Sequence, residues 1–244
     1  MKVLAIVQAR TGSSRLPNKV MKKIEGMSVI EILLSRLKKS KKIDHIVLAT
    51  SSLKRDDILA RHITRIGFDL FRGSEENVLS RFFEASKIYN VDTIIRITGD
   101  CPIVESSIID EMIEVFKSSN VDYMSNIDPP TYPDGLDVEI FTKSSLKMVN
   151  NLATLRFDRE HVTPFYRSFN LFKKKCFKNK IDMSNYRFTL DEERDFIFFQ
   201  RLFKLFRPNI FFHWEEVVDI MRSNSDILKL NQNILRNEGS KNDY

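Results

Sequence analysis

The stretch VLAIVQARTGSSRLPNK, residues 3–19, joins an apolar run to a loop rich in hydroxyl and basic residues. The run over residues 3–9 predicts a buried strand, because short apolar runs followed by turn residues are typical of parallel sheets. Three cations, Arg10, Arg15 and Lys19, follow in the loop that leaves this strand, and the stretch contains no acidic residue. The stretch therefore predicts an α/β fold with an anion-binding loop at the edge of its sheet.

Apolar runs alternate with amphipathic segments through the first half of the chain. The runs that predict strands cover residues 3–9, 43–50, 69–72, 93–99 and 121–125. The segments with helical spacing cover residues 28–40, 54–66, 76–89 and 106–118. This alternation predicts a doubly wound, mainly parallel sheet, in which ligands bind at the carboxyl ends of the strands.

The pattern changes after residue 127, where three prolines and a glycine fall within eight residues and predict a loop. Beyond this loop, strands are predicted over 136–141, 171–178 and 186–190, and helices over 143–152, 158–168 and 192–206. We expect three parts: an α/β core over 1–127, a small inserted α+β subdomain over 128–185, and a return strand with C-terminal helices over 186–244.

Composition narrows the class of protein. A chain of 244 residues with 42% hydrophobic content can bury a sizeable core. The net charge of +6 favours an anionic partner but does not separate nucleic acid from a nucleotide. With only Cys101 and Cys176, no disulfide framework is predicted. No secretory segment and no apolar run near the roughly 18 residues of a spanning helix occur, so we expect a cytoplasmic protein without membrane insertion.

The basic loop has the composition of a phosphate cradle. Gly12 and the hydroxyl residues let backbone amides turn toward an anion, while arginine forks and a lysine charge suit phosphate oxygens. The P-loop signature is absent, because Asn18 stands where that motif needs a glycine before its lysine. On these residues alone, a solvated basic loop is the alternative.

Two carboxylates are candidates for a metal site. Asp100 ends the run 93–99, and a parallel sheet places it at the same edge as the basic loop. Mg²⁺ is commonly held by one or two carboxylates together with substrate phosphates. The alternative for Asp100 is a cap of the helix that starts near residue 106. Asp191 follows the predicted strand 186–190, and N-capping of the next helix explains it equally well.

Six segments in order resemble the cytidylyltransferase family that makes CMP-activated nonulosonic and octulosonic acids. The resemblance is closest to the spore-coat polysaccharide biosynthesis F-like branch and covers residues 1 to about 200. The matching segments are 8–19, 73–81, 99–102, 134–139, 159–164 and 187–191. The stretch 128–141 differs from the octulosonate and sialate branches, which leaves the sugar open.

The resemblance implies a nucleotide-diphospho-sugar transferase-like fold and a homodimer. It also implies transfer of CMP from CTP to the anomeric hydroxyl of a sugar acid, with pyrophosphate released, for surface polysaccharide or glycan biosynthesis. The nucleotide would bind in 1–127, and 128–185 would serve sugar binding and dimerisation. Nucleotide contacts would come from Ala9, Arg10, Gly12, Ser14, Arg15, Lys19, Gly73, Ser74, Asn77 and Asp100.

Within that set, the resemblance makes Arg15, Lys19 and Asp100 catalytic. It assigns Mg²⁺ to Asp100 and Asp191 as the cofactor. The sugar acid would face Asp137, Glu139, Arg159, His161 and Thr163.

Three other functions remain as alternatives. A glycosyltransferase on a related fold usually holds its metal with an Asp-x-Asp pair, which this sequence lacks. A nucleic-acid-binding module would cluster its cations, yet here they are scattered apart from the loop and KKSKK at 38–42. A non-catalytic nucleotide binder is disfavoured by the presence of Lys19 and Asp100. We therefore expect CTP and a sugar acid as partners, and no nucleic acid.

Overall fold

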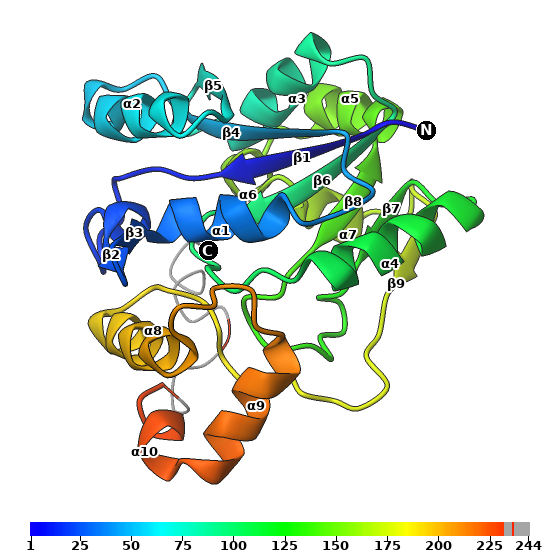
Figure 1. Cartoon of the computed structure of the whole chain (residues 1–244). Helices are drawn as coiled ribbons and strands as arrows, with labels where there is room; N and C mark the ends of the chain where they lie inside the picture. The colour runs from blue at the N-terminus through cyan, green and yellow to red at the C-terminus, as the bar shows by residue number, and fades with distance from the viewer. Residues whose placement is uncertain (232–235, 237–244) are drawn as a thin grey trace.

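A seven-stranded mixed sheet forms the centre of the molecule in a computed structural model that describes residues 1–231 and 236 (Figure 1). Its order is β5 (Asp69–Gly73), β4 (His45–Ser51), β1 (Val3–Gln8), β6 (Thr93–Thr98), β8 (Glu139–Thr142), β7 (Tyr123–Ser125) and β9 (Lys174–Cys176). The strands β5, β4, β1 and β6 are parallel, whereas β8 runs antiparallel between β6 and β7. A separate hairpin joins β2 (Lys23–Ile24) and β3 (Met27–Ser28). The doubly wound, mainly parallel sheet is confirmed.

Helices cover both faces of this sheet. They are α1 (Val29–Leu37), α2 (Asp57–Arg65), α3 (Val78–Ile88), α4 (Ser106–Ser118), α5 (Lys143–Leu152), α6 (Arg156–His161), α7 (Pro164–Ser168), α8 (Glu193–Phe206), α9 (Trp214–Ser223) and α10 (Ser225–Leu228), with short 3₁₀ turns η1 (Lys19–Met21) and η2 (Lys54–Asp56). Figure 1 shows α1 and α4 on one side of the sheet and α3 and α5 on the other. Within the described residues, no helix is long and apolar enough to cross a membrane.

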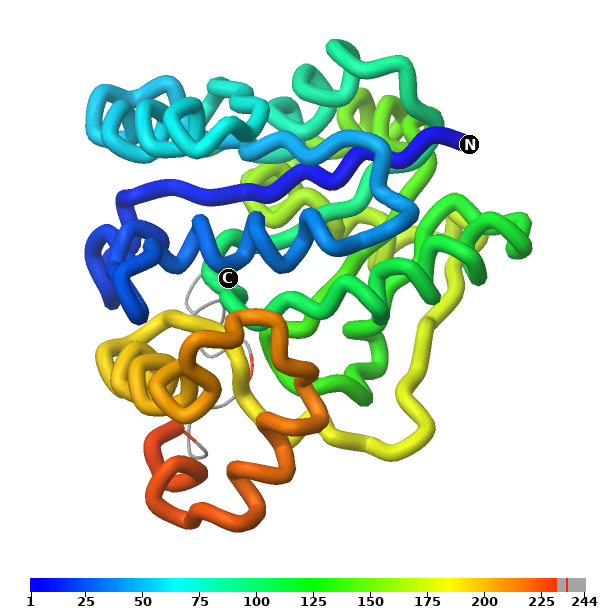
Figure 2. Tube along the Cα trace, viewed as in Figure 1, coloured from blue at the N-terminus to red at the C-terminus, as the bar shows by residue number. Residues whose placement is uncertain are grey.

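The alternation of side chains along β1 builds two cores. Val3, Ala5 and Val7 pack in the cluster that contains the apolar faces of α1, α4 and α8. Leu4 and Ile6 point to the other face and pack in the cluster that contains α3 and α5. Figure 2 shows the yellow-to-red segment after α7 returning on the side of α1, which agrees with the place of α8 and α9 in the first cluster.

The ends of β1 and β6 are held side by side. The Gly99 amide donates to the Gln8 carbonyl at 2.8 Å. A Cβ on Gly99 would lie 2.7 Å from Ala9 Cβ, closer than real Cβ atoms approach one another. Glycine at this position therefore lets the basic loop after β1 and the Asp100 turn after β6 leave the sheet as neighbours.

The second half of the chain differs from the sequence-based prediction in three places. The segment 128–185 contributes β8 and β9 to the main sheet, so it extends that sheet rather than building one of its own. The segment predicted to be helical over 158–168 is helical in two pieces, α6 and α7, because the chain breaks at Val162, with φ 71°, and restarts at Pro164. The return strand predicted over 186–190 is wrong: within the described residues this segment makes one parallel bridge, between Arg187 and Asp134.

Candidate active site

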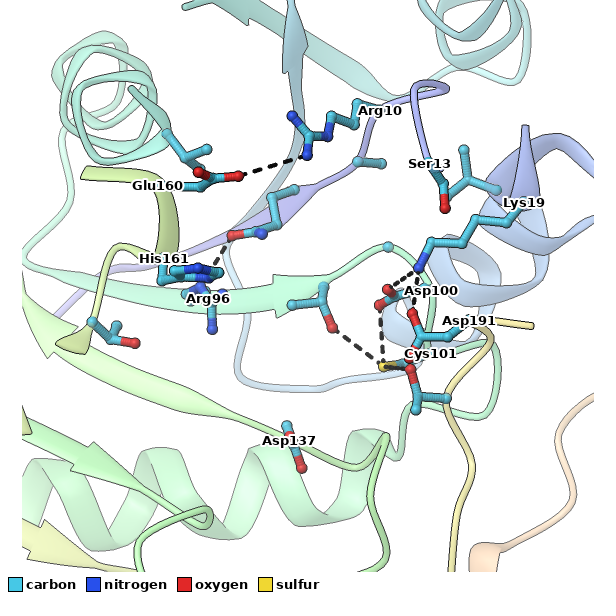
Figure 3. Close-up of a pocket in the computed structure, with 18 of the residues that line it drawn as sticks. Arg10, Ser13, Lys19, Arg96, Asp100, Cys101, Asp137, Glu160, His161 and Asp191 are labelled. Atoms are coloured by element: carbon cyan, nitrogen blue, oxygen red, sulfur yellow. Dashed lines mark hydrogen bonds and ion pairs between the residues drawn. The ribbon is translucent and has the colours of Figure 1, made fainter. Parts of the chain in front are cut away.

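A cavity of about 820 Å³ opens where the chain leaves β1 and β6 (Figure 3). The loop before β8, the helices α6 and α7, and the segment before α8 also contribute residues to its wall. The sequence-predicted site residues that line it are Ala9, Arg10, Gly12, Ser14, Arg15, Lys19, Asp100, Asp137, His161, Thr163 and Asp191. Segments distant in sequence therefore meet in one space at the carboxyl edge of the parallel strands.

The basic loop is fixed at its start by a buried carboxylate. Asp56 is fully buried and accepts hydrogen bonds from the Thr11 backbone amide at 2.7 Å and the Thr11 hydroxyl at 2.8 Å. The Thr11 carbonyl in turn accepts from the amides of Ser13 and Asn18. A Cβ on Gly12 would meet the Arg55 guanidinium at 2.9 Å. These contacts set the loop's shape, and no local motif in the sequence pointed to Asp56.

Lys19 joins the two predicted metal ligands. Its ammonium donates to Asp100 Oδ2 at 2.6 Å and to Asp191 Oδ1 at 2.8 Å. The two carboxylates meet because the Leu190 amide donates to the Asp100 carbonyl at 2.8 Å, which docks the segment before α8 against the end of β6. Burial opposes the charge on Lys19, but the two carboxylates outweigh it and raise the pKa of the ammonium above its ordinary value.

Asp191 is held from several sides. Arg187 donates to Asp191 Oδ2 at 2.9 Å, and Arg15 lies 3.2 Å from Oδ1. The backbone amide of Asp191 donates to Asp195, a fully buried carboxylate that also pairs with Arg187. Burial would raise the pKa of Asp191, but Lys19, then Arg15 and Arg187, hold it below its ordinary value. The group is therefore an anion at neutral pH, as a metal ligand needs to be.

Two further arginines line the cavity, Arg10 of the basic loop and Arg81 of α3. Arg10 pairs with Glu75 at 3.2 Å and with Glu160 of α6 at 3.7 Å. Arg81, also in the cavity wall, is 3% exposed and donates to the Ser74 carbonyl at 3.0 Å. Burial, reinforced by Arg10, lowers the pKa of Arg81 to about 10, so it stays charged at neutral pH. This end of the cavity therefore presents two guanidinium groups, with Glu75 and Glu160 as the carboxylates beside Arg10.

Two acids with raised pKa values also line the cavity. Asp134 pairs with Arg187 at 3.0 Å, and Asp137 hydrogen-bonds to Arg236. Burial, reinforced by Asp137, raises the pKa of Asp134 to about 7 despite the neighbouring arginines. The turn between them requires glycine, because Gly135 has φ +102° and a Cβ there would lie 2.4 Å from the Phe188 backbone.

Two arginines of the cavity wall, Arg96 and Arg167, pair with the same buried acid, Glu139. Glu139, the first residue of β8, is 1% exposed and does not line the cavity. Its carboxylate accepts from Arg96 of β6, from Arg167 of α7 at 3.2 Å, and from the Tyr123 hydroxyl. Burial would raise the pKa of Glu139, but Arg96 and Arg167 hold it below its ordinary value.

Several predicted site residues lie outside the cavity lining. Asn77 caps α3 through the Ser80 amide, and Ser74 accepts from the Asn77 amide, so with Gly73 they shape the turn that positions Arg81. Arg159 points to Asn150 of α5, where it donates to the backbone carbonyl at 2.9 Å. The lining residues that sequence reasoning missed include Arg81, Arg96, Asp134, Glu160, Arg167, Arg187 and Arg236.

The thiol of the cavity does not show the features of a nucleophile. Burial, then the neighbouring Asp100, raises the pKa of Cys101 well above its ordinary value, so its thiol stays protonated. His161 lines the cavity with its ring 4.6 Å from that of Phe157. The chemistry of the cavity is therefore that of a charged binding site.

Comparison with known proteins shows which family the chain belongs to. A family model described as Cytidylyltransferase matches residues 4–238. The chain is 39% identical over 240 residues to an uncharacterized protein of Methanocaldococcus jannaschii, with 96% of each chain covered. It is 32% identical to the spore coat polysaccharide biosynthesis protein SpsF of Bacillus subtilis, over 92% of this chain and 95% of that one.

A 3-deoxy-manno-octulosonate cytidylyltransferase of Fusobacterium nucleatum is 32% identical over 69% of this chain and 64% of its own. The solved structure of a cytidylyltransferase from Leptospira borgpetersenii has a TM-score of 0.90 at 32% identity, covering 97% of this chain and all of that one. The resemblance seen in the sequence, including its spore-coat branch, is thus confirmed. The chain belongs to the cytidylyltransferase family and is a nucleotidyltransferase that uses CTP.

Proposed function

We propose that the protein transfers CMP from CTP to the anomeric hydroxyl of a sugar acid of the ulosonic type, and releases pyrophosphate. The observation that carries this proposal is the meeting of Lys19, Asp100 and Asp191 at the end of the basic loop. Relatives named for octulosonate activation and for spore-coat polysaccharide synthesis support a sugar acid and a role in surface polysaccharide or glycan synthesis.

The basic loop would bind the triphosphate. Arg15 and Lys19 carry charges that reach into the cavity, and Arg10 and Arg81 lie beside them. In an in-line displacement the sugar hydroxyl attacks the α-phosphorus, and negative charge grows on the departing pyrophosphate. Fixed cations aimed at that charge lower the barrier because they need no reorganisation during the reaction. Lys19 and Arg15 would release their carboxylate partners to meet the phosphates.

Asp100 and Asp191 fit a divalent cation, because both carboxylates already meet at one cationic atom, Lys19 Nζ. We propose Mg²⁺ as that cation, held by these two side chains together with substrate phosphates. When bound, it neutralises charge on the reacting phosphates. The chain's own task is to aim both carboxylates at one point, and Arg187 and Asp195 hold Asp191 in place for it.

We propose a homodimer that associates through segment 128–185. Six large apolar side chains of this segment are between 43% and 65% exposed: Met148, Leu152, Leu155, Phe169, Leu171 and Ile181. Exposed apolar groups in such number favour a protein contact. Light scattering during size exclusion should report a dimer, and Leu155→Asp should shift it toward monomer. A cytoplasmic location agrees with the use of CTP.

The proposed reaction is tested by measuring pyrophosphate release. Each of the four nucleoside triphosphates is paired with a panel of ulosonic acids and simpler sugars in the presence of Mg²⁺. We expect release only with CTP together with at least one ulosonic acid. Release with a neutral sugar alone would contradict the proposed acceptor, and release of a nucleoside diphosphate from a sugar nucleotide would favour a glycosyltransferase.

A further inference from the structure

The surface at the C-terminal end of α1 is rich in basic side chains. The run KKSKK, residues 38–42, follows this helix, and Lys204 and Arg207 lie where α8 ends. The two helix ends are neighbours, because Arg36 of α1 donates through Nη1 to the carbonyl of Ile210, in the loop after α8, at 2.6 Å. Figure 2 shows this loop, in orange, passing beside α1. Segments far apart in the sequence therefore bring their cations to one surface.

Three of these lysines carry unpaired charges. Lys38, Lys39 and Lys204 are exposed, and among the residues that the structure describes none of the three forms an ion pair. Elsewhere on the surface, by contrast, the exposed Lys87 pairs with Glu84 at 2.7 Å. Three lysine charges at this surface are therefore available to a partner.

The acids around this surface act on other groups. Two of them form ion pairs: Glu25 with Arg207 at 3.4 Å, and Glu114 with Lys42 at 2.7 Å. The first turn of α9 carries Glu215 and Glu216, whose charges act on Tyr132 and on the buried Arg36. The surface therefore keeps an excess of positive charge.

Two exposed apolar side chains stand among the lysines. Leu205, in the last turn of α8, is 57% exposed, and Phe211, in the loop before α9, is 42% exposed. The Lys39 ammonium lies 4.4 Å from the centroid of the Phe211 ring, so the basic and apolar groups share one surface. We call Lys38, Lys39, Lys204, Leu205 and Phe211 the basic-apolar patch. None of these five residues lines the cavity.

This mixture of side chains suits an anionic lipid bilayer. The surface potential of such a bilayer attracts lysines, and apolar side chains gain free energy when they enter the boundary between headgroups and acyl chains. A nucleic acid would pair with the lysines and stack on Phe211, but it offers no such boundary to the aliphatic Leu205. Compensation of the helix dipole explains cations at the ends of α1 and α8, but it does not explain exposed apolar neighbours.

We infer that the basic-apolar patch docks the protein reversibly on an anionic membrane surface. The lysines lie against the headgroups, while Leu205 and Phe211 enter the headgroup boundary, and no helix crosses the bilayer. Because the patch and the cavity share no residue, docking leaves the cavity free for its substrates. The inference does not depend on the acceptor or on the proposed metal.

The docking is tested by sedimentation of the full chain with lipid vesicles. Vesicles of phosphatidylcholine alone are compared with vesicles that also contain phosphatidylglycerol, each at low and at high salt. We expect the partition coefficient to be about tenfold or more higher for the anionic vesicles at low salt. High salt should reduce this preference, because it screens exposed charges.

Variants separate the patch from the overall charge of the protein. Lys38→Gln combined with Lys39→Gln should lower binding to anionic vesicles about twentyfold, because each lysine near such a surface contributes about fivefold. The matched control is Lys178→Gln combined with Lys180→Gln, which removes the same charge from exposed positions after β9 and should bind nearly as the wild type does.

A further variant tests the apolar part of the patch. Leu205→Gln keeps the charge, and it should lower binding to anionic vesicles about fivefold because less apolar surface leaves water. The affinity for CTP should equal that of the wild type in every variant, which verifies that each one is folded.

Four results would overturn the docking: no sedimentation with anionic vesicles, equal binding to neutral and anionic vesicles, equal losses in the two double variants, or a Leu205 variant that binds as the wild type does. Binding of nucleic acid that depends on Lys38 and Lys39, without binding to vesicles, would assign the patch to a nucleic-acid partner instead. Failure of the proposed CMP transfer would leave these vesicle results unchanged, so the two proposals fail separately.

Discussion

The two ends of the cavity hold their charges in opposite ways. At one end a single cation, Lys19, bridges two carboxylates, and all three side chains are between 13% and 22% exposed. At the other end a single carboxylate, Glu139, bridges two guanidinium groups, and its side chain is only 2% exposed. We propose that the first set exchanges partners when phosphates arrive, whereas the second, whose shared group is buried, stays locked. We propose that the first end serves chemistry and that the second keeps the cavity wall in shape.

The largest expected effect is at the exchangeable end. Asp100→Asn removes one of the two charges proposed to hold the metal and should slow pyrophosphate release about a thousandfold, equivalent to about 4 kcal/mol of barrier. The thermal midpoint should stay close to that of the wild type, because the side chain is part of an open wall. Asp219→Asn, an exposed change on α9, is the control. Near-normal turnover in the Asp100 variant would refute the metal assignment.

At the locked end, the largest effect should be on stability. Glu139→Gln breaks a buried charge cluster and should cost about 3 kcal/mol at pH 7. Arg96 and Arg167 hold the pKa of Glu139 below its ordinary value of 4.5, so the stabilisation is full above that pH and is lost as the pH falls below it. The difference between variant and wild type should therefore shrink from pH 7 to pH 3.5. Thermal unfolding across this range measures it, and a constant difference would contradict the account.

A smaller effect is expected for the loop arginine. Arg15→Ala removes a cation that faces Asp191 and, in our proposal, the triphosphate. Affinity for CTP should fall about thirtyfold, near the 2 kcal/mol of a charged hydrogen bond, and turnover should slow. Arg194→Ala, exposed on α8, is a matched control. Unchanged CTP binding would show that the loop is a solvated basic loop.

The smallest expected effect concerns the exchange of Lys19 for a metal ion between Asp100 and Asp191. Lys19 occupies the point where Asp100 and Asp191 meet, so in the absence of nucleotide it competes with a metal ion. Lys19→Met should tighten Mn²⁺ binding to the nucleotide-free protein about tenfold, although turnover falls. Lys22→Met changes a neighbouring lysine that pairs with exposed Glu193, and it should leave the affinity for Mn²⁺ unchanged. Electron paramagnetic resonance of free Mn²⁺ measures the affinity of the variant and of the wild type. Equal affinities would mean that Lys19 does not compete with the metal ion.

The two ends also differ in how far the sequence could predict them. The basic loop and Asp100 follow adjacent strands, so the parallel alternation alone placed them at one edge. The contact between Asp100 and Asp191 depends on the hydrogen bond from the Leu190 amide to the Asp100 carbonyl, which no local pattern encodes. From its position alone, Asp191 was equally well explained as a metal ligand or as a helix cap, and only the family resemblance favoured the metal.

The end around Glu139 was harder to predict for a physical reason. Its members come from β6, β8 and α7, and β8 enters the sheet antiparallel between β6 and β7, against the alternation seen earlier in the chain. Arg96 did carry a signal, since a charge inside an apolar strand needs a partner. Glu139 was expected to face the sugar, yet the structure buries it behind Arg96 and Arg167, which line the cavity.

The central claim, CMP transfer to a sugar acid in this cavity, is tested most directly by phosphorus NMR of a reaction containing CTP, Mg²⁺ and an accepted ulosonic acid. The account predicts that CTP is converted to equal amounts of pyrophosphate and a phosphodiester of CMP with the sugar. Accumulation of free CMP or CDP without a phosphodiester product would contradict it.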